Sequence, residues 1–194
     1  AEGAVFVPLA DLRDADHIYM AIARTLTLDA PGARAWRDQV VDALRDHELL
    51  LVLDNLEQFT DVASRLDDLL TSCPRLTVLA TSRSVLHVSG EHVVPVEPLL
   101  LPEAVQLFTG RAKARQPDFR LIAANASTIT AICERLDRLP LAIELAAARL
   151  PALTPHRLLV ELDPALPVLT GGARDHPARL QTMQAAIAWT YDQL

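Results

Sequence analysis

The segment LLLVLDNLEQ, residues 49–58, decides the fold class of this chain. Its first five residues are all apolar and do not alternate with polar ones, which predicts a strand covered on both faces, as in the middle of a parallel sheet. Asp54 then stands at the carboxyl end of that strand, where open α/β sheets bind their ligands. Because Glu57 follows three residues later, the sequence predicts two carboxylates at this edge of the sheet.

Patterns typical of strands and of helices alternate over the first half of the chain. Short apolar runs predict further strands at residues 5–9, 76–81 and 93–96. Apolar residues at helical spacing predict helices at residues 16–27, 33–46 and 58–71. Alternation of this kind indicates βαβ units, so we expect an α/β fold with a parallel sheet.

From Pro98 onwards the sequence predicts helices alone, at residues 102–115, 125–136, 140–150, 155–162 and 179–194. Asn125 can cap the second of them, and Pro140 suits the first turn of the third, where its missing N–H is not needed. Several Pro and Gly residues predict a linker between the last two helices. The expected domains are an α/β domain at 1–98, an all-α domain at 99–163, a linker at 164–178 and the start of a further domain at 179–194.

The composition limits the classes of partner. The net charge of −7 argues against broad electrostatic binding to nucleic acid or to an anionic membrane. No apolar stretch reaches the length of a membrane span without a charge. Cys73 and Cys133 stand far apart with no metal-binding spacing, which predicts free thiols in a reducing cytoplasm.

Three motifs could carry chemistry, and each also has a plain structural interpretation. Asp54 with Glu57 could serve Mg²⁺ and a water molecule, although acids are also favoured at the start of a helix. The tripeptide at 81–83, TSR, could sense a phosphate, or it could be a turn with a capping Ser and a surface Arg. The segment LDRLPLAIEL, residues 136–145, taken alone only begins a buried helix.

In this order and spacing, the motifs resemble those of the STAND class of P-loop NTPases, near its NB-ARC branch (AP-ATPases). The likeness is greatest to the ATPase modules of bacterial LuxR-type and AfsR/SARP-type transcriptional regulators. Residues 49–57 resemble their Walker B segment, LLVLDNxE, and residues 81–83 the end of their sensor strand. Residues 136–150 are similar to their LDGLPLAIELAAARL segment, and residues 179–194 to the helix that begins their winged-helix domain.

The resemblance implies an ATP- or ADP-binding molecular switch that regulates transcription. It implies that Asp54 holds Mg²⁺ through water and that Glu57 positions a hydrolytic water. It also implies that Thr81 and Arg83 contact the nucleotide, and that Arg83 responds to the γ-phosphate. Pro140 would pack against adenine. The implied fold is a P-loop NTPase core at 1–98, a helical lid domain at 99–163, a linker, and the first helix of a winged-helix domain at 179–194. The implied partners are the winged helix and C-terminal sensor repeats of the same protein.

Two departures from the family pattern stand out. Arg138 occupies the place of a family Gly, in a tight turn that calls for positive φ. The only lysine is Lys113, inside a predicted helix, so a GxxxxGK[ST] phosphate loop is missing, and the resemblance places that loop before Val5. We therefore expect these 194 residues to bind nucleotide weakly and to have no ATPase activity, and the intact parent to be at most a slow ATPase with Mg²⁺ and ATP or ADP as cofactors. The resemblance also places a strand directly before this loop, at the centre of the sheet. Without that strand, its neighbours would have unpaired edges, which favour self-association.

Two other functions compete with the switch. The motifs could persist as the scaffold of a nucleotide-independent protein-interaction module. Direct DNA binding by this segment is disfavoured by its acidic balance, although one basic cluster is present and consists of Arg111, Lys113, Arg115 and Arg120.

Overall fold

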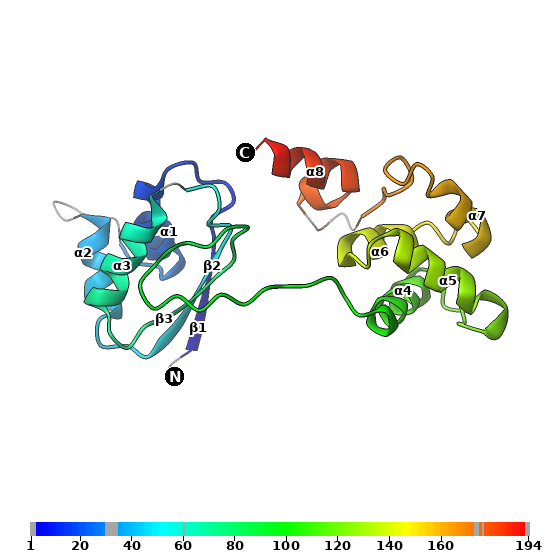
Figure 1. The fold of residues 1–194 in the computed structure, drawn as a ribbon. Helices are drawn as coiled ribbons and strands as arrows, with labels where there is room; N and C mark the ends of the chain where they lie inside the picture. Colours follow the sequence, from blue (N-terminus) through cyan, green and yellow to red (C-terminus); the bar gives the residue numbers. More distant parts are fainter. Residues whose placement is uncertain (1–2, 30–34, 60, 173–174, 176, 193–194) are drawn as a thin grey trace. The chain divides into compact units, whose positions relative to one another are not determined.

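The structure is a computed structural model, and it describes residues 3–29, 35–59, 61–172, 175 and 177–192 (Figure 1). The chain divides into two units, residues 1–94 and residues 95–194. The first unit contains β1 (Gly3–Pro8), η1 (Ala15–His17), α1 (Ile18–Thr25), α2 (Trp36–Leu44), β2 (Leu49–Asp54), α3 (Val62–Ser72) and β3 (Thr77–Ala80). The second contains α4 (Leu101–Arg115), α5 (Ala123–Arg135), α6 (Pro140–Ala147), α7 (Pro155–Glu161), η2 (Ala178–Leu180) and α8 (Met183–Tyr191).

The first unit is an α/β layer built on a parallel sheet of three strands in the order β1-β2-β3. The register pairs Pro8 with Asp54 and Leu53 with Ala80, so the carboxyl ends of the three strands meet at one edge. The apolar run that predicted a central strand is β2, which has a neighbour on each side within the described residues.

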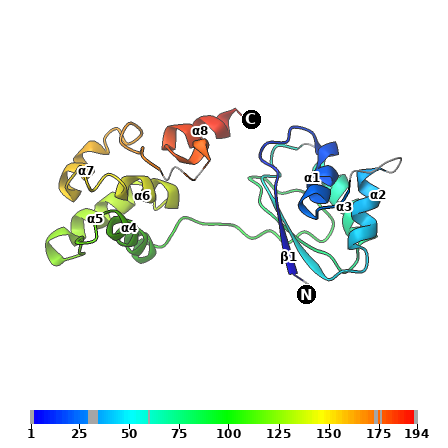
Figure 2. The same cartoon turned by 180° about the vertical axis from the view of Figure 1, so that it is seen from behind.

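The sheet has one covered face and one open face. Helices α1, α2 and α3 all lie on the same side of it (Figures 1 and 2). Val7, Leu51 and Leu53 point to that side and are fully buried. The alternate positions form a row across the three strands, in which Phe6 is 56% exposed and Leu79 is 54% exposed. The prediction that β2 is covered on both faces is therefore wrong for the described residues, because every described helix of this unit packs on one side.

The predicted strand at 93–96 is also wrong. The described segment between β3 and α4 contains no strand, and Val94 and Val96 are exposed. Pro95 within the run and Pro98 after it have no N–H to donate to a ladder, so a strand at this place would lack donors.

Several helices differ from their predicted bounds. The predicted helix at 140–150 is α6, which ends at Ala147, and the predicted helix at 179–194 is α8, which begins only at Met183 after the short helix η2. Asn125 does not cap α5: it lies inside the first turn, where its Oδ1 accepts a hydrogen bond of 2.9 Å from the Ile122 N–H. The helix consequently begins earlier, at Ala123. Helix α3 begins later than predicted, at Val62, because residues 55–59 form the turn that follows β2. Some predicted positions lie outside the described residues. They are residues 33 and 34 of the predicted helix at 33–46, residue 60 of that at 58–71, residues 173, 174 and 176 of the predicted linker, and residues 193 and 194 of the predicted helix at 179–194.

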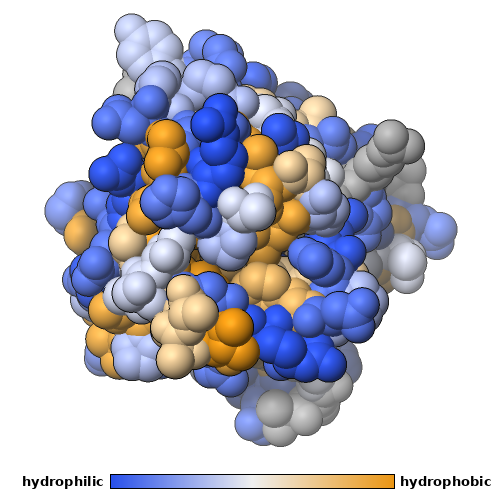
Figure 3. All heavy atoms as spheres, turned by 90° about the vertical axis from the view of Figure 1, so that its right-hand side faces the viewer, coloured by the Kyte–Doolittle hydropathy of each residue, from blue (hydrophilic) through white to orange (hydrophobic). Residues whose placement is uncertain are grey.

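The second unit is helical and has its own core. Helix α4 packs against α5 and α6, and α5 packs against α7. Phe108 and Phe119 meet edge to face inside it, with ring centroids 6.5 Å apart. Figure 3 looks onto this unit and shows apolar surface broken up by polar side chains. No helix among the described residues has the length and apolar character that a bilayer span requires.

Candidate functional site

The carboxyl end of β2 brings Asp54 and Thr81 into contact. Asp54 is the last residue of this central strand, and Thr81 directly follows β3. The Thr81 hydroxyl donates a hydrogen bond of 2.7 Å to Asp54 Oδ1. Their backbones are fixed as well, since the Thr81 N–H donates to the Leu53 carbonyl at 3.0 Å and the Leu9 N–H to the Asp54 carbonyl at 3.1 Å. The sheet ladder therefore continues past the strand ends and holds the Asp54 carboxylate at this edge.

Asn55 turns the chain sharply after Asp54. Its φ is +71°, in the left-handed region that Asn tolerates better than most residues. Its N–H donates to Thr81 Oγ1 at 2.9 Å, so the Thr81 hydroxyl accepts from Asn55 while it donates to Asp54. Its side-chain Nδ2 donates to Glu57 Oε1 at 3.3 Å. Asn55 thus connects the two carboxylates of the segment.

Glu57 and Arg83 form an ion pair at the same edge. Arg83 Nε lies 3.3 Å from Glu57 Oε1, and the side chain of Glu57 is only 10% exposed. The structure therefore brings four sequence-predicted residues together, namely Asp54, Glu57, Thr81 and Arg83. Pro140 belongs to the other unit, where it is exposed at the first position of α6.

Sequence reasoning missed two residues of this edge, Asn55 and Gln58. Gln58 Nε2 donates to the Leu9 carbonyl and so connects the loop after β2 with the loop after β1. Its Oε1 is buried and has no hydrogen-bond partner among the described residues. The sequence did contain one indication of the role of Asn55. Asn directly after a strand is typical of a turn with positive φ.

The oxygen-rich edge suits a hydrated Mg²⁺ better than a fully protein-bound metal. No group of three or more His, Cys, Asp or Glu side chains that could hold a metal occurs among the described residues. Mg²⁺ commonly uses one or two carboxylates, several waters and a ligand phosphate. A carboxylate has acceptor capacity for more than one hydrogen bond, so Asp54 retains capacity beside its bond to Thr81. The residues fit the metal half of such a site, whereas a phosphate cradle is not among the described residues.

A second polar cluster, formed by Tyr19, Arg37 and Asp68, joins the three helices on the covered face. The Tyr19 hydroxyl donates to Asp68 Oδ2 at 2.8 Å, and Arg37 makes two bonds of 2.6 Å to the same carboxylate. The hydrogen bonds from Arg37 and then Tyr19 lower the pKa of Asp68 to about 2. Burial, followed by the bond to Asp68, raises the pKa of Tyr19. This cluster lies among α1, α2 and α3 and ties these helices together.

Two of the four residues in the predicted basic cluster, Arg111 and Arg120, have partners within their own unit. Arg111 donates to Glu144 Oε1 through Nε at 3.0 Å and through Nη2 at 2.8 Å. Arg120 donates to the carbonyls of Pro117 and Phe119. Both guanidinium groups therefore have partners inside the protein.

Comparison with known proteins shows similarity along nearly the whole chain. A protein of Mycobacterium bovis named "Putative HTH-type transcriptional regulator" is 38% identical over 193 residues, which is 98% of this chain and 22% of the relative. A protein of Mycobacterium tuberculosis H37Rv with the same name has the same identity and coverage. An "Uncharacterized protein" of M. tuberculosis H37Rv is 38% identical over 185 residues, 94% of this chain and 47% of the relative. No family model matches the chain.

The chain spans less than half of each of these relatives. What it resembles is therefore a segment of longer proteins, two of which are named as HTH-type transcriptional regulators.

Proposed function

We propose that this chain is part of a cytoplasmic transcriptional regulator in which it acts as an ATP- or ADP-controlled switch. The observation that carries the proposal is the convergence of Asp54, Thr81, Glu57 and Arg83 at the carboxyl end of a parallel sheet. Ligands of open α/β sheets bind at this end. Similarity to proteins named as HTH-type transcriptional regulators supports the regulatory part of the proposal.

Each residue of the edge has a role in this proposal. Asp54 would hold Mg²⁺ through water, and Thr81 would orient the carboxylate of Asp54 by its short hydrogen bond. Glu57 would accept a hydrogen bond from a water molecule, and Arg83 would contact a phosphate. Mg²⁺, when bound, would neutralise phosphate charge. Pro140 would contact the adenine ring from the helical unit, and the nucleotide would shift the population between two arrangements of the protein.

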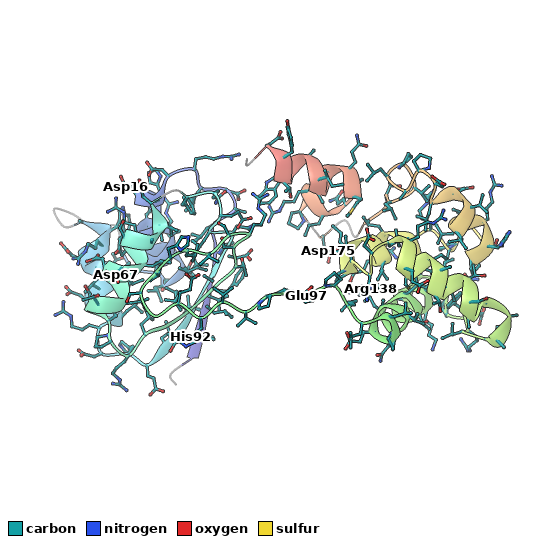
Figure 4. All side chains as sticks on the ribbon, in the orientation of Figure 1. Asp16, Asp67, His92, Glu97, Arg138 and Asp175 are labelled. Carbon is teal, nitrogen blue, oxygen red and sulfur yellow. The ribbon has the colours of Figure 1, made fainter. Side chains whose placement is uncertain are left out.

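Isothermal titration calorimetry with ATP and Mg²⁺ on the complete natural protein tests the proposal. We expect Thr81→Val to weaken Mg²⁺-dependent binding about 10- to 100-fold, since it removes the group that orients the Asp54 carboxylate. Thr81→Ser keeps the hydroxyl and is the matched control. Asp67→Asn, on the exposed side of α3 (Figure 4), controls for the loss of a charge and should leave binding unchanged. No binding by the wild-type protein would refute the switch.

Residues 1–194 alone should bind ATP far more weakly than the complete protein, because they contain no phosphate loop. Micromolar affinity for ATP in residues 1–194 alone would overturn this expectation.

The second candidate is a nucleotide-independent interaction module. The open sheet face, with Phe6 and Leu79 each more than half exposed, favours it. In that case the complete protein would not bind ATP in the calorimetric experiment. Asp54→Asn would leave the affinity for a protein partner unchanged.

A further inference from the structure

We propose that Arg83 is a latch on Glu57: it holds this carboxylate in the ligand-free protein and releases it when a phosphate-bearing ligand binds at the same edge. The inference rests on the proposed function and adds the regulation of its site. Its starting point is that the Glu57 side chain is 10% exposed and ion-paired, while the Arg83 side chain is 37% exposed. The carboxylate is thus enclosed, and its cationic partner lies closer to solvent.

The contacts on Glu57 are longer than those on Asp54 and Asp68, the two other carboxylates that the clusters of this unit hold. Arg83 Nε and Asn55 Nδ2 both lie 3.3 Å from Glu57 Oε1. Strong charge-assisted bonds measure about 2.7–2.9 Å. The Thr81 bond to Asp54, at 2.7 Å, and the Arg37 bonds to Asp68, at 2.6 Å, fall at or below this range. The ion pair of Arg83 with Glu57 is therefore weaker than that of Arg37 with Asp68, and less energy is needed to separate it.

A phosphate competes well for such a cation. A guanidinium presents planar donors that match phosphate oxygens two at a time, and a phosphate carries more charge than a carboxylate. After Arg83 turns to a phosphate, Asn55 still holds Glu57 in place through its amide. The Oε1 atom of Glu57 has then lost its ion pair with Arg83, keeps its bond from the Asn55 amide, and can accept a hydrogen bond from water. Glu57 is in this way coupled to the presence of the anion.

A double-mutant cycle in the complete natural protein tests the latch, with inorganic triphosphate and Mg²⁺ as the probe. Glu57→Gln should tighten triphosphate binding severalfold, because Arg83 no longer has to leave a charged partner. Arg83→Gln should weaken it. In the Arg83→Gln background, Glu57→Gln should have no further effect, since the partner that it releases is already absent. Asp67→Asn is the matched control for removing one acid and should not change the affinity.

An equal gain from Glu57→Gln in both backgrounds would mean that only general electrostatics acts, and would overturn the latch. In the ligand-free protein, the Nε–H of Arg83 should exchange with water more slowly in the wild type than in Glu57→Gln, and equal exchange rates would also overturn it. If ATP binding requires Thr81 but the cycle shows no coupling, the latch alone fails. If neither ATP nor triphosphate binds the wild-type protein, the latch and the proposed switch fail together.

Discussion

At the scale of single residues, the backbone conformation of two non-glycine positions shapes the loops. Asn55 has a φ of +71° and Arg138 a φ of +57°. Asn reaches this region at little cost, whereas it costs an ordinary residue roughly 1–2 kcal/mol. Arg138 lies in the turn between α5 and α6 (Figure 4), where its N–H donates to the Cys133 carbonyl at 3.0 Å. The positive φ expected at Arg138, from the Gly of the resembled family, is confirmed.

We predict that Arg138→Gly stabilises the helical unit. Relief of the left-handed strain exceeds the extra chain entropy of Gly, so the free energy of unfolding should rise by about 0.5–1 kcal/mol. Urea denaturation followed by Trp189 fluorescence, in a Trp36→Phe background, measures the change. Lys113→Gly, inside α4 and exposed, is the matched control and should lower the free energy of unfolding by about 1 kcal/mol. A loss of similar size in both variants would contradict the prediction.

At the scale of elements, the cluster of Tyr19, Arg37 and Asp68 joins α1, α2 and α3 over the sheet. Arg37 comes from α2 and Asp68 from α3, and the two bonds between them are charge-assisted. Tyr19, on α1, completes the cluster through its hydroxyl. Three short helices on one sheet face are thus fixed by polar contacts as well as by their buried apolar side chains.

The depressed pKa of Asp68 predicts a loss of stability in acid. In the folded state this pKa is about 2, and its ordinary value is 3.8. A carboxyl with a lowered folded pKa contributes stability above its unfolded pKa and loses that contribution as the pH falls towards the folded pKa. The wild-type protein should therefore lose more stability between about pH 4 and pH 2 than Asp68→Asn does.

Urea unfolding of the first unit at several pH values, followed by Trp36 fluorescence, measures this difference. Because Asp68 is partly exposed, the effect should be modest and should shrink with added salt. Asp67→Asn, one residue earlier on the exposed side of α3, should follow the wild-type pH dependence. If Asp68→Asn loses as much stability in acid as the wild type, the cluster does not contribute.

At the scale of the whole molecule, the described residues form two separate hydrophobic cores. The first is built from the sheet and α1–α3, and Leu53 is fully buried in it. The second is built mainly from α4–α7 and contains Leu145, which is 1% exposed. Each unit also carries one of the two tryptophans, Trp36 in the first and Trp189 in the second.

We predict that a cavity in one core destabilises mainly its own unit. Leu53→Ala should lower the free energy of unfolding of the first unit by about 2–5 kcal/mol, because the buried side chain leaves a cavity. The transition reported by Trp36 should move, and that reported by Trp189 should move much less. Leu145→Ala is the reciprocal control. Equal shifts of both fluorescence transitions in either variant would show that the two cores unfold as one.

The sequence by itself determined the features that depend on neighbouring residues along the chain. The unbroken apolar run before Asp54 predicted β2, and helical spacing predicted α4 and α6. The Gly of the resembled family predicted the positive φ of Arg138. Strand β2 and helices α4 and α6 follow from the period of the apolar residues, which can be read from a short window. The positive φ of Arg138 was expected from the resemblance alone, because Arg itself disfavours this region.

Only the tertiary structure decided which distant residues meet. Parallel pairing of Leu53 with Ala80 brings Thr81 onto Asp54, and the turn at Asn55 takes Glu57 to Arg83. The open face beside Phe6 also emerged only there, since an apolar residue in a strand does not reveal whether a helix covers it. Such contacts depend on the register between segments far apart in sequence, and local patterns do not fix that register.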